Sequence, residues 1–349
     1  MYSANVWSDP KLYLSHFGAT VCYDDFLESL QRRAAGANVV FPAEVEEALL
    51  ETTEAGLETL RDLVISHRLA QIRLANEEIE LREQRLADAT QRLALEPSRT
   101  GRNTLRTLKR KIAAARRRRE ALVLGTQDSQ VCRMFPGTYV PILVMHEGVL
   151  EVKPMRYQCR PSHVDRRVET LLVTPHHARR DSLAGTWRRE FGRTHGLIAA
   201  ESLFDAVSLH RMHRREVAKG EQLAALELEF LPVPSQTLYI PCVWSHWERP
   251  GQEDLRSFAV VVDRAPEELQ AVGQDWCPVT VKRERVLDWL CPQADDLAAC
   301  HALLEDRPAI RYHNVPYSPA RAQFVRGLMA SLETTGKPTR SRSAKANLL

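Results

Sequence analysis

The chain has 349 residues, 44% of them hydrophobic, which is enough to bury a sizeable core in one large domain or two smaller ones. Its 48 basic and 45 acidic residues nearly cancel, so the net charge of +3 does not by itself indicate a nucleic-acid partner. The longest apolar run, residues 139–145, is too short to cross a bilayer and the first residues lack the pattern of a secretory signal, so we expect a cytoplasmic protein without a membrane partner.

Two helical arms are predicted from about residue 43 to residue 125. The first arm has no proline until Pro97 and repeats apolar residues at intervals of seven, at Ile65, Ile72, Ile79, Leu86 and Leu93. After a break around Pro97 and Gly101, a second apolar stripe follows at helical spacing, at Leu105, Leu108, Ile112, Ala115 and Leu122. The short connection predicts an antiparallel coiled-coil hairpin.

The second arm is strongly basic, whereas the first is rich in glutamate. Its cations fall in two runs, which contain Arg106, Lys109, Arg110, Lys111 and Arg116 to Arg119. One interpretation is that the two arms neutralise each other and leave a solvated face. The other is a phosphate-binding stripe, whose affinity would fall steeply with salt.

Beyond the hairpin, short β-type runs alternate with proline and glycine. Strands are predicted at 139–145, 168–173, 196–200, 226–231, 238–244 and 257–262. Helices are predicted near 182–191, 264–272, 283–290, 294–304 and 319–331. Because the strands are not regularly separated by helices, the pattern favours an α+β fold with a mainly antiparallel sheet. The basic, polar residues 331–349 are expected to be disordered.

No metal or cofactor is expected from the motifs. His176 and His177 are adjacent and would point to opposite faces of a strand, and His210 and His213 lie among arginines that repel a cation. The seven cysteines are widely spread and contain no C-x-x-C pair, which argues against a zinc ribbon and a disulfide framework. No Walker loop, G-x-S-x-G motif or dinucleotide fingerprint is present.

Six segments carry a resemblance to a known family. They read, in chain order, MYSANVWSDPKLYLSHFGA, FPGTYVPILVMHEGVLEVKPMRYQCRP, HARRD, THGLIAAESLFDAV, IPCVWSHWERPGQEDLRSFAVVV and VGQDWCPVTVKRERVLDWL. The most specific part is a W-x-x-W motif, Trp244 and Trp247, together with three short motifs that follow it in the chain. These are Phe258-Ala259, Asp275-x-x-Pro278 and Trp289-Leu290. In order and spacing these segments resemble the SRAP family, the SOS response-associated peptidases, and the hairpin resembles the insertion of one bacterial branch.

The resemblance implies an SRAP-like, mainly antiparallel β core with flanking helices and the hairpin as an insertion. Residues 1–42 and 126–330 would form the SRAP-like domain, 43–125 the insertion, and 331–349 a basic tail. It further implies a nucleoid-associated protein that binds single-stranded DNA and reacts with abasic sites. In the family, an N-terminal cysteine condenses with the sugar aldehyde through its thiol and α-amine, while an Asn, a Glu and a His position the sugar and move protons.

This sequence departs from the family at all four of those positions. Tyr2 follows Met1 where the family has the cysteine. The Asn, Glu and His positions are occupied here by His177, Asp205 and Gln274. Aspartate keeps the carboxylate with a shorter reach, whereas glutamine removes a group that titrates near neutrality.

DNA contacts are implied at Tyr2 and at three further positions. Arg179 is retained from the family's N-A-R-x-E motif and is expected to contact a phosphate, and Asp181 stands for the Glu of that motif. Arg156 and Tyr157 match an R-W segment and, with Tyr2, are the other DNA-facing candidates. The competing interpretations are an internal salt bridge for Arg179, with Asp181 or Asp205, and a solvated turn carboxylate for Asp205.

Three functions remain open from the sequence. The first is binding of single-stranded and abasic DNA in the DNA damage response, with covalent cross-linking impaired or lost. The second is an active cross-linking enzyme or peptidase that uses another nucleophile, or whose start codon is assigned wrongly. The third is a scaffold that binds a protein partner through the hairpin.

Overall fold

The computed structural model describes residues 3–125, 131–165, 175–213, 215–217, 220–221, 224–293 and 296–317. The strand predicted at 168–173, the helix at 319–331 and the tail at 331–349 lie outside the described residues, as do Met1 and Tyr2.

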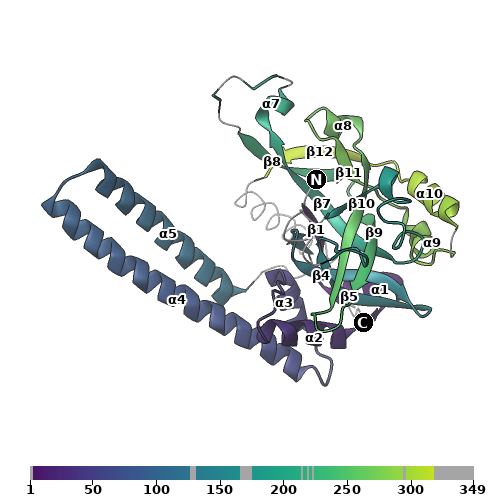
Figure 1. The fold of residues 1–349 in the computed structure, drawn as a ribbon, viewed down its shortest axis with the longest axis horizontal. Helices are drawn as coiled ribbons and strands as arrows, with labels where there is room; N and C mark the ends of the chain where they lie inside the picture. The colour runs from purple at the N-terminus through teal and green to yellow at the C-terminus, as the bar shows by residue number, and fades with distance from the viewer. Residues whose placement is uncertain are drawn as a thin grey trace, which may run out of the picture.

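A single mixed sheet forms the body of the protein (Figure 1). Its strands are β1 (Ser3–Trp7), β2 (Thr20–Val21), β3 (Val131–Met134), β4 (Tyr139–His146), β5 (Val149–Tyr157), β6 (His177–Arg179), β7 (His195–Ser208), β8 (Ala225–Val233), β9 (Leu238–Trp247), β10 (Leu255–Arg264), β11 (Trp276–Pro278) and β12 (Arg311–Pro316). Most neighbours are antiparallel; β2 with β5, β5 with β10 and β6 with β10 are parallel. The predicted α+β class with a mainly antiparallel sheet is confirmed.

Five of the strands close into a small barrel. The pairings run from β4 to β5, β10, β9 and β7, and β7 returns to β4 through Leu143 and Leu197. The second half of β7 leaves the ring and pairs with β1 on one edge and β8 on the other. Closing the ring pairs backbone groups that an open sheet would leave at its edges.

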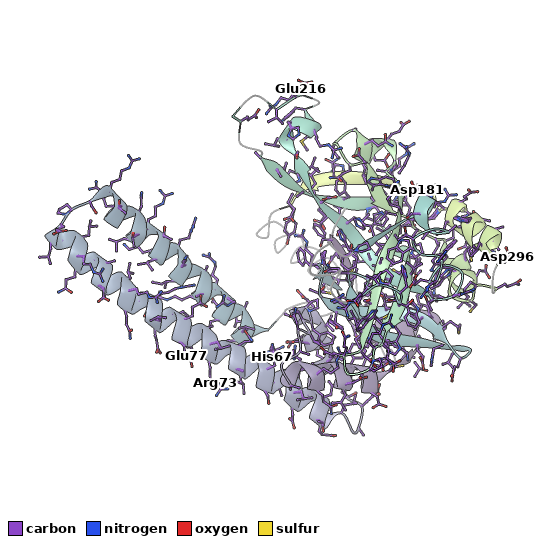
Figure 2. All side chains as sticks on the ribbon, in the orientation of Figure 1. His67, Arg73, Glu77, Asp181, Glu216 and Asp296 are labelled. Atoms are coloured by element: carbon purple, nitrogen blue, oxygen red, sulfur yellow. The ribbon has the colours of Figure 1, made fainter. Side chains whose placement is uncertain are left out.

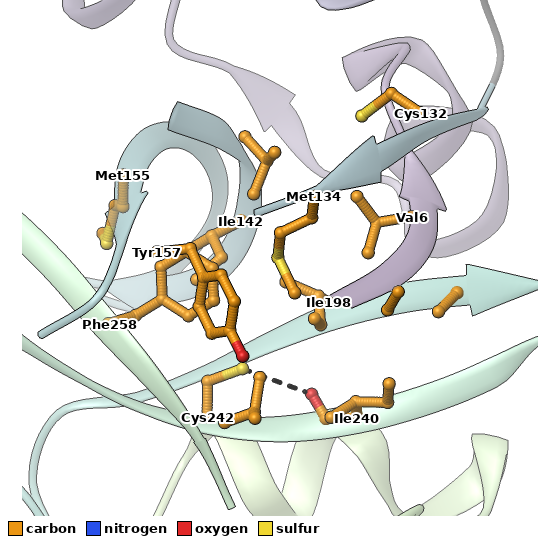
Figure 3. Packing of buried hydrophobic residues seen from close by; sticks show 14 of the residues in the cluster. Val6, Cys132, Met134, Ile142, Met155, Tyr157, Ile198, Ile240, Cys242 and Phe258 are labelled. Atoms are coloured by element: carbon orange, nitrogen blue, oxygen red, sulfur yellow. Dashed lines mark hydrogen bonds between the residues drawn. The ribbon is translucent and has the colours of Figure 1, made fainter. Parts of the chain in front are cut away.

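The barrel separates two hydrophobic clusters because side chains alternate along each strand. The inner cluster contains Ile142, Met155, Ile240 and Phe258, whose side chains converge in Figure 3. The outer cluster contains the next residues along the strands, such as Leu143, and is covered by helices.

Short helices cover the outer face. They are α1 (Pro10–Phe17), α9 (Val286–Leu290) and α10 (Leu297–Glu305). Two other helices, α2 (Tyr23–Ala34) and α3 (Ala43–Leu50), pack on the inner cluster. The short helix α7 (Leu209–Met212) follows β7, and α8 (Glu267–Gln270) lies in the connection between β10 and β11. Asp9 caps α1 by accepting a hydrogen bond from the Lys11 amide at 2.9 Å, and Gly18 ends it with φ of 69°.

Two of the predicted helices differ from the structure. Residues 182–191 form successive turns, with i to i+3 hydrogen bonds such as Gly185 N–H to Ser182 O at 3.1 Å, because Gly185 weakens the helix while the turns already bury Trp187. The helix predicted at 264–272 is reduced to α8, since β10 extends to Arg264 and Pro266 begins the turn.

The predicted first arm is divided. Residues 43–50 form α3, which packs into the body, and the arm itself is α4 (Glu58–Leu95), joined to α5 (Arg99–Leu124) by a tight turn. The Ser98 side chain caps α5 by accepting from the Gly101 amide at 3.0 Å. Gly101 lies in the first turn of α5 against Leu93 of α4, where a Cβ would lie 2.8 Å from Leu93 Cδ1 and would displace that side chain. The two helices run side by side away from the body (Figure 1).

Among the residues that the structure describes, no helix is both long and apolar enough to span a membrane.

A buried histidine links β7 to the outer helices. His195 is 2% exposed, and its ring stacks on Trp289 with the centroids 3.8 Å apart. The Gly192 amide donates to Nε2 at 2.9 Å, so Nδ1 carries the proton and donates to the Trp289 carbonyl at 2.7 Å. This neutral form is stabilised by burial, which lowers the pKa of His195 to about 4.

We predict that His195 contributes to acid destabilisation. The unfolded chain takes up a proton near pH 6.5 and the folded chain only near pH 4, so the free energy of unfolding falls by roughly 3 kcal/mol as the pH decreases through this window. His195→Asn should be less stable at neutral pH and should lose much less stability on acidification. Urea unfolding at about pH 7 and 4.5 measures this. The exposed His163→Gln is the control, and an unchanged pH dependence in His195→Asn would contradict the assignment.

Candidate functional site

Three segments distant in sequence meet at one mouth of the barrel. Ser3 and Ala4 of β1 line a small cavity there together with Tyr157, Val260 and Pro278. On β10, Val260 pairs with His177 of β6, and Val262 pairs with Pro278 of β11. The start of β1, the HARRD segment and the β11 segment therefore share this mouth.

The two histidines of the HARRD segment lie together. His177 pairs with Val260 and therefore faces the inner side of the barrel. The expectation that His176 and His177 point to opposite faces is wrong: their ring centroids are 4.0 Å apart, because His176 sits in a bend before β6. His176 also contacts Tyr157 edge-on at 5.7 Å between centroids, and burial lowers the pKa of His176.

Asp205 lies beside the start of β1. Its neighbour Phe204 pairs with Ser3, so Asp205 is one position further along β7, where β1 begins. It is half-buried, its carboxylate accepts from the Ala206 amide at 2.8 Å, and its negative charge opposes the lowering of the His176 pKa. The structure thus brings the Asp205 carboxylate into electrostatic range of His176.

Arg179 is exposed at the rim of the mouth. Its guanidinium carbon lies 4.4 Å from the ring centroid of Trp276, a cation–π contact. The same guanidinium forms a two-pronged salt bridge with Asp181, in which Nε donates at 3.1 Å, and this bridge raises the pKa of Arg179. Figure 2 places Asp181 on the side of the body away from the helical arm. The internal salt bridge considered from the sequence is therefore present, with Asp181 as the partner.

Tyr157 does not face solvent. Its side chain is 1% exposed and packs against Phe258 of β10, with 5.4 Å between the ring centroids (Figure 3). The expectation that Tyr157 faces DNA is corrected by this burial, because the ring has no free face on which a base can stack.

Arg156 is separated from Arg179. Arg156 pairs with Ser257 of β10 and Arg179 with Val262, five residues further along, so alternation places the two side chains on opposite faces and about 17 Å apart. Nε of Arg156 donates to the Gln158 carbonyl at 3.2 Å. The structure does not join these two arginines into one phosphate site.

Gln274 is buried in the loop between α8 and β11. The residue is 8% exposed, and its backbone amide donates to the Leu269 carbonyl at 3.0 Å. The preceding Gly273 has φ of +91° and packs against Arg211, where a Cβ would meet the arginine at 2.9 Å. Gln274 lies two residues before Trp276 and is therefore close to the rim of the mouth. It is buried beneath the surface and not exposed on the rim.

Sequence reasoning missed Trp276 and His176 as members of this group. Trp276 lay within the quoted segment VGQDWCPVTVKRERVLDWL, but no local pattern pairs it with an arginine almost a hundred residues away. His176 had only its adjacency to His177, and strand alternation argued against their contact.

The internal cysteines are poor nucleophiles. Burial raises the pKa of Cys159 and of Cys277 to about 12, and that of Cys22 to about 11. A thiol reacts as its thiolate, so little reactive form exists at neutral pH. All seven cysteines are free, and only Cys291 is exposed.

Within the described residues, no group of three or more histidine, cysteine, aspartate or glutamate side chains is arranged to hold a metal ion.

The fold and the mouth define an α+β barrel protein whose rim carries an arginine stacked on a tryptophan. The chain belongs to the SRAP family: the family model described as SOS response associated peptidase (SRAP) matches residues 100–319, more than half of the chain. This membership associates the protein with the response to DNA damage. The search of curated proteins finds no match.

Three solved structures are similar over about half of this chain. A protein from Bacteroides thetaiotaomicron shares 13% identity and has a TM-score of 0.41, covering 53% of this chain and 76% of its own. A protein from Bordetella bronchiseptica shares 15% identity with a TM-score of 0.43, covering 53% and 87%. A phage-related protein from the same species shares 15% identity with a TM-score of 0.41, covering 55% and 84%.

We predict that the native protein shows one rapidly reacting thiol, that of Cys291. Titration with a chromogenic disulfide near neutral pH should modify this group quickly and the buried cysteines only after unfolding, when all seven react. Cys291→Ser should remove the fast phase. A fast phase that survives in this variant would reveal an activated internal thiol.

Proposed function

We propose that this protein binds single-stranded DNA, including DNA with abasic sites, at the barrel mouth, and that its covalent cross-linking chemistry is impaired or lost. The observation that carries the proposal is Arg179, an exposed cation held in place by Trp276 at the mouth where the start of β1, His177 and Asp205 meet.

The salt bridge of Arg179 does not prevent phosphate binding. Both side chains of the Arg179–Asp181 pair are more than half exposed, at 53% and 57%. An exposed ion pair is typically worth no more than about 1 kcal/mol, so a phosphate can compete with Asp181 for the guanidinium. The cation–π contact with Trp276 holds the guanidinium near the rim, which reduces the entropy lost on binding.

The catalytic positions support the second half of the proposal. Gln274 replaces an imidazole and is buried, and Tyr2 follows Met1 where the family resemblance places the cysteine. Burial suppresses the thiolates of the internal cysteines, so none of them is a ready substitute. His177 and Asp205 remain near the mouth and are suited to contact a bound sugar.

Two alternative functions remain. An active enzyme would need a nucleophile other than the buried cysteines, such as the α-amine of the chain. In a scaffold role, the helical arm would bind a protein partner. The arm extends away from the body, so its surface is accessible to such a partner (Figure 1).

We predict that Arg179→Ala weakens binding of a single-stranded oligonucleotide several-fold and lowers the salt dependence by about 0.7 in the slope of log K against log salt. Asp181→Asn should strengthen binding, because the competing carboxylate is removed and Arg179 stays in place. Fluorescence anisotropy over a salt titration measures both effects. The exposed Arg188→Ala is the matched control, and equal affinities of Arg179→Ala and this control would remove Arg179 from the site.

We predict that the chain beginning Met1-Tyr2 forms no heat-stable adduct with abasic single-stranded DNA, although it binds that DNA. A terminal amine alone yields a reversible Schiff base without the ring closure that a thiol provides, and the missing imidazole costs typically about 10²- to 10⁴-fold in rate. Inserting Cys between Met1 and Tyr2 should restore part of the cross-linking, with His177 near the site. A high adduct yield from the parent protein in a denaturing gel would overturn the loss of chemistry.

A further inference from the structure

The positive charge of the protein is concentrated in the helical arm. Residues 58–124 contain 16 Lys or Arg and 9 Asp or Glu, which leaves 32 basic and 36 acidic residues in the rest of the chain. Most of the excess is on α5, which has ten basic residues and a single acidic one, Glu120. A nearly neutral chain is therefore an acidic body with a basic arm, so the arm and not the whole chain attracts polyanions.

Six cations share one face of α5. A helix turns by about 100° per residue, which places them within a sector roughly 100° wide, away from the buried Ile112 and Ala115 that contact α4. These cations are Arg99, Arg102, Arg106, Lys109, Arg110 and Arg117, and all are exposed. At a rise of 1.5 Å per residue the face extends for about 27 Å. We call this set of six residues the α5 rail.

The glutamates of α4 neutralise the flanks of α5 and not the rail. Arg116 pairs with Glu83 at 2.5 Å, and Arg118 pairs with Glu78 beside the seam. Within the described part of the chain, none of the six rail residues is within ion-pair distance of a carboxylate. The neutralising interpretation therefore applies to Arg116 and Arg118, whereas the rail has no carboxylate partner on α4, and for the rail the phosphate-binding interpretation stays a prediction.

The side chains between the rail cations indicate which anion fits. Residues 58–124 contain no Phe, Trp or Tyr, so the arm has no platform on which unpaired bases stack. Between Arg99 and Arg117 the rail face has no large apolar side chain, only Ala113, and such a helix has nothing to insert into a lipid interface. A partner that presents only phosphates, with its bases turned inward, matches these properties.

We propose that the α5 rail binds the phosphate backbone of duplex DNA, as a second contact surface separate from the barrel mouth. In a duplex each strand has one phosphate per about 3.4 Å of axis, so a length of about 27 Å carries roughly eight phosphates per strand, and the rail contacts those that lie on the side facing it. The contact would be independent of base sequence. It does not require the mouth to bind DNA, and the two surfaces together would suit a junction between duplex and single strand.

The test compares two four-fold charge variants of the full-length protein. The rail variant is Arg102→Gln, Arg106→Gln, Arg110→Gln and Arg117→Gln, since glutamine keeps a helix propensity close to that of arginine. The control variant replaces four exposed arginines of the body by glutamine and so removes the same charge. These are Arg188, Arg189, Arg285 and Arg311. Circular dichroism verifies that both retain the parent's helix content.

Binding of a blunt duplex of about 20 base pairs is followed by anisotropy from about 50 to 200 mM salt. The rail variant should lose at least about tenfold in affinity at the lowest salt, and its slope of log K against log salt should decrease by about 3 to 4. The control variant should stay close to the parent. Unchanged duplex binding in the rail variant, or an equal loss in the control, overturns the proposal.

Two further measurements separate the surfaces and the partners. A short oligothymidine should bind the rail variant nearly as well as it binds the parent, and it should bind Arg179→Ala more weakly. A wrong assignment of the mouth and a wrong assignment of the rail therefore give different results. Vesicles containing phosphatidylserine should bind the parent more weakly than the duplex does, because the rail has charge but no large apolar side chain to insert. Strong rail-dependent binding to these vesicles without duplex binding would assign the rail to a membrane instead.

Discussion

The hydrogen bonding of β7 is the constraint on which the rest of the structure depends. This strand (His195–Ser208) closes the barrel with its first half, through β4 and β9, and holds β1 and β8 with its second half. Each buried backbone group must be paired, and side-chain alternation makes a one-residue slip costly, so the register is fixed along the whole strand. The same ladder therefore determines where the chain begins relative to Asp205 and which residues reach the mouth.

Burial gives the body its stability and also limits its chemistry. The inner cluster that packs Tyr157 and Phe258 keeps the nearby thiol of Cys242 protonated, and it lowers the pKa of His176 at its edge. Five of the seven cysteine thiols are buried, whereas the exposed rim of the mouth carries Arg179, which binds charge and does not transfer protons at neutral pH. This division favours recognition over covalent reaction in the protein as it stands.

The arm adds a second electrostatic region to the molecule. The base of α4 is anchored in the body, where Leu60 and Val64 join the inner cluster and Arg68 pairs with Glu47 of α3 at 2.6 Å. Beyond this anchor the arm extends into solvent with little contact to the body (Figure 1). Because exposed charges more than about 10 Å apart are largely screened at physiological salt, the electrostatic fields of the acidic body and the basic arm are largely independent.

The sequence alone determined the elements whose signals are local. The apolar periodicity between Ile65 and Leu122 predicted the hairpin, and the β-type run at 257–262 predicted a strand, because each pattern lies within a single element. The domain limits proposed around the hairpin stay predictions. Only the tertiary structure decided that Tyr157 is buried, that His176 meets His177, and that Arg179 stacks on a distant tryptophan. These contacts depend on the pairing of β10 with strands far away in the chain, and no local pattern records that register.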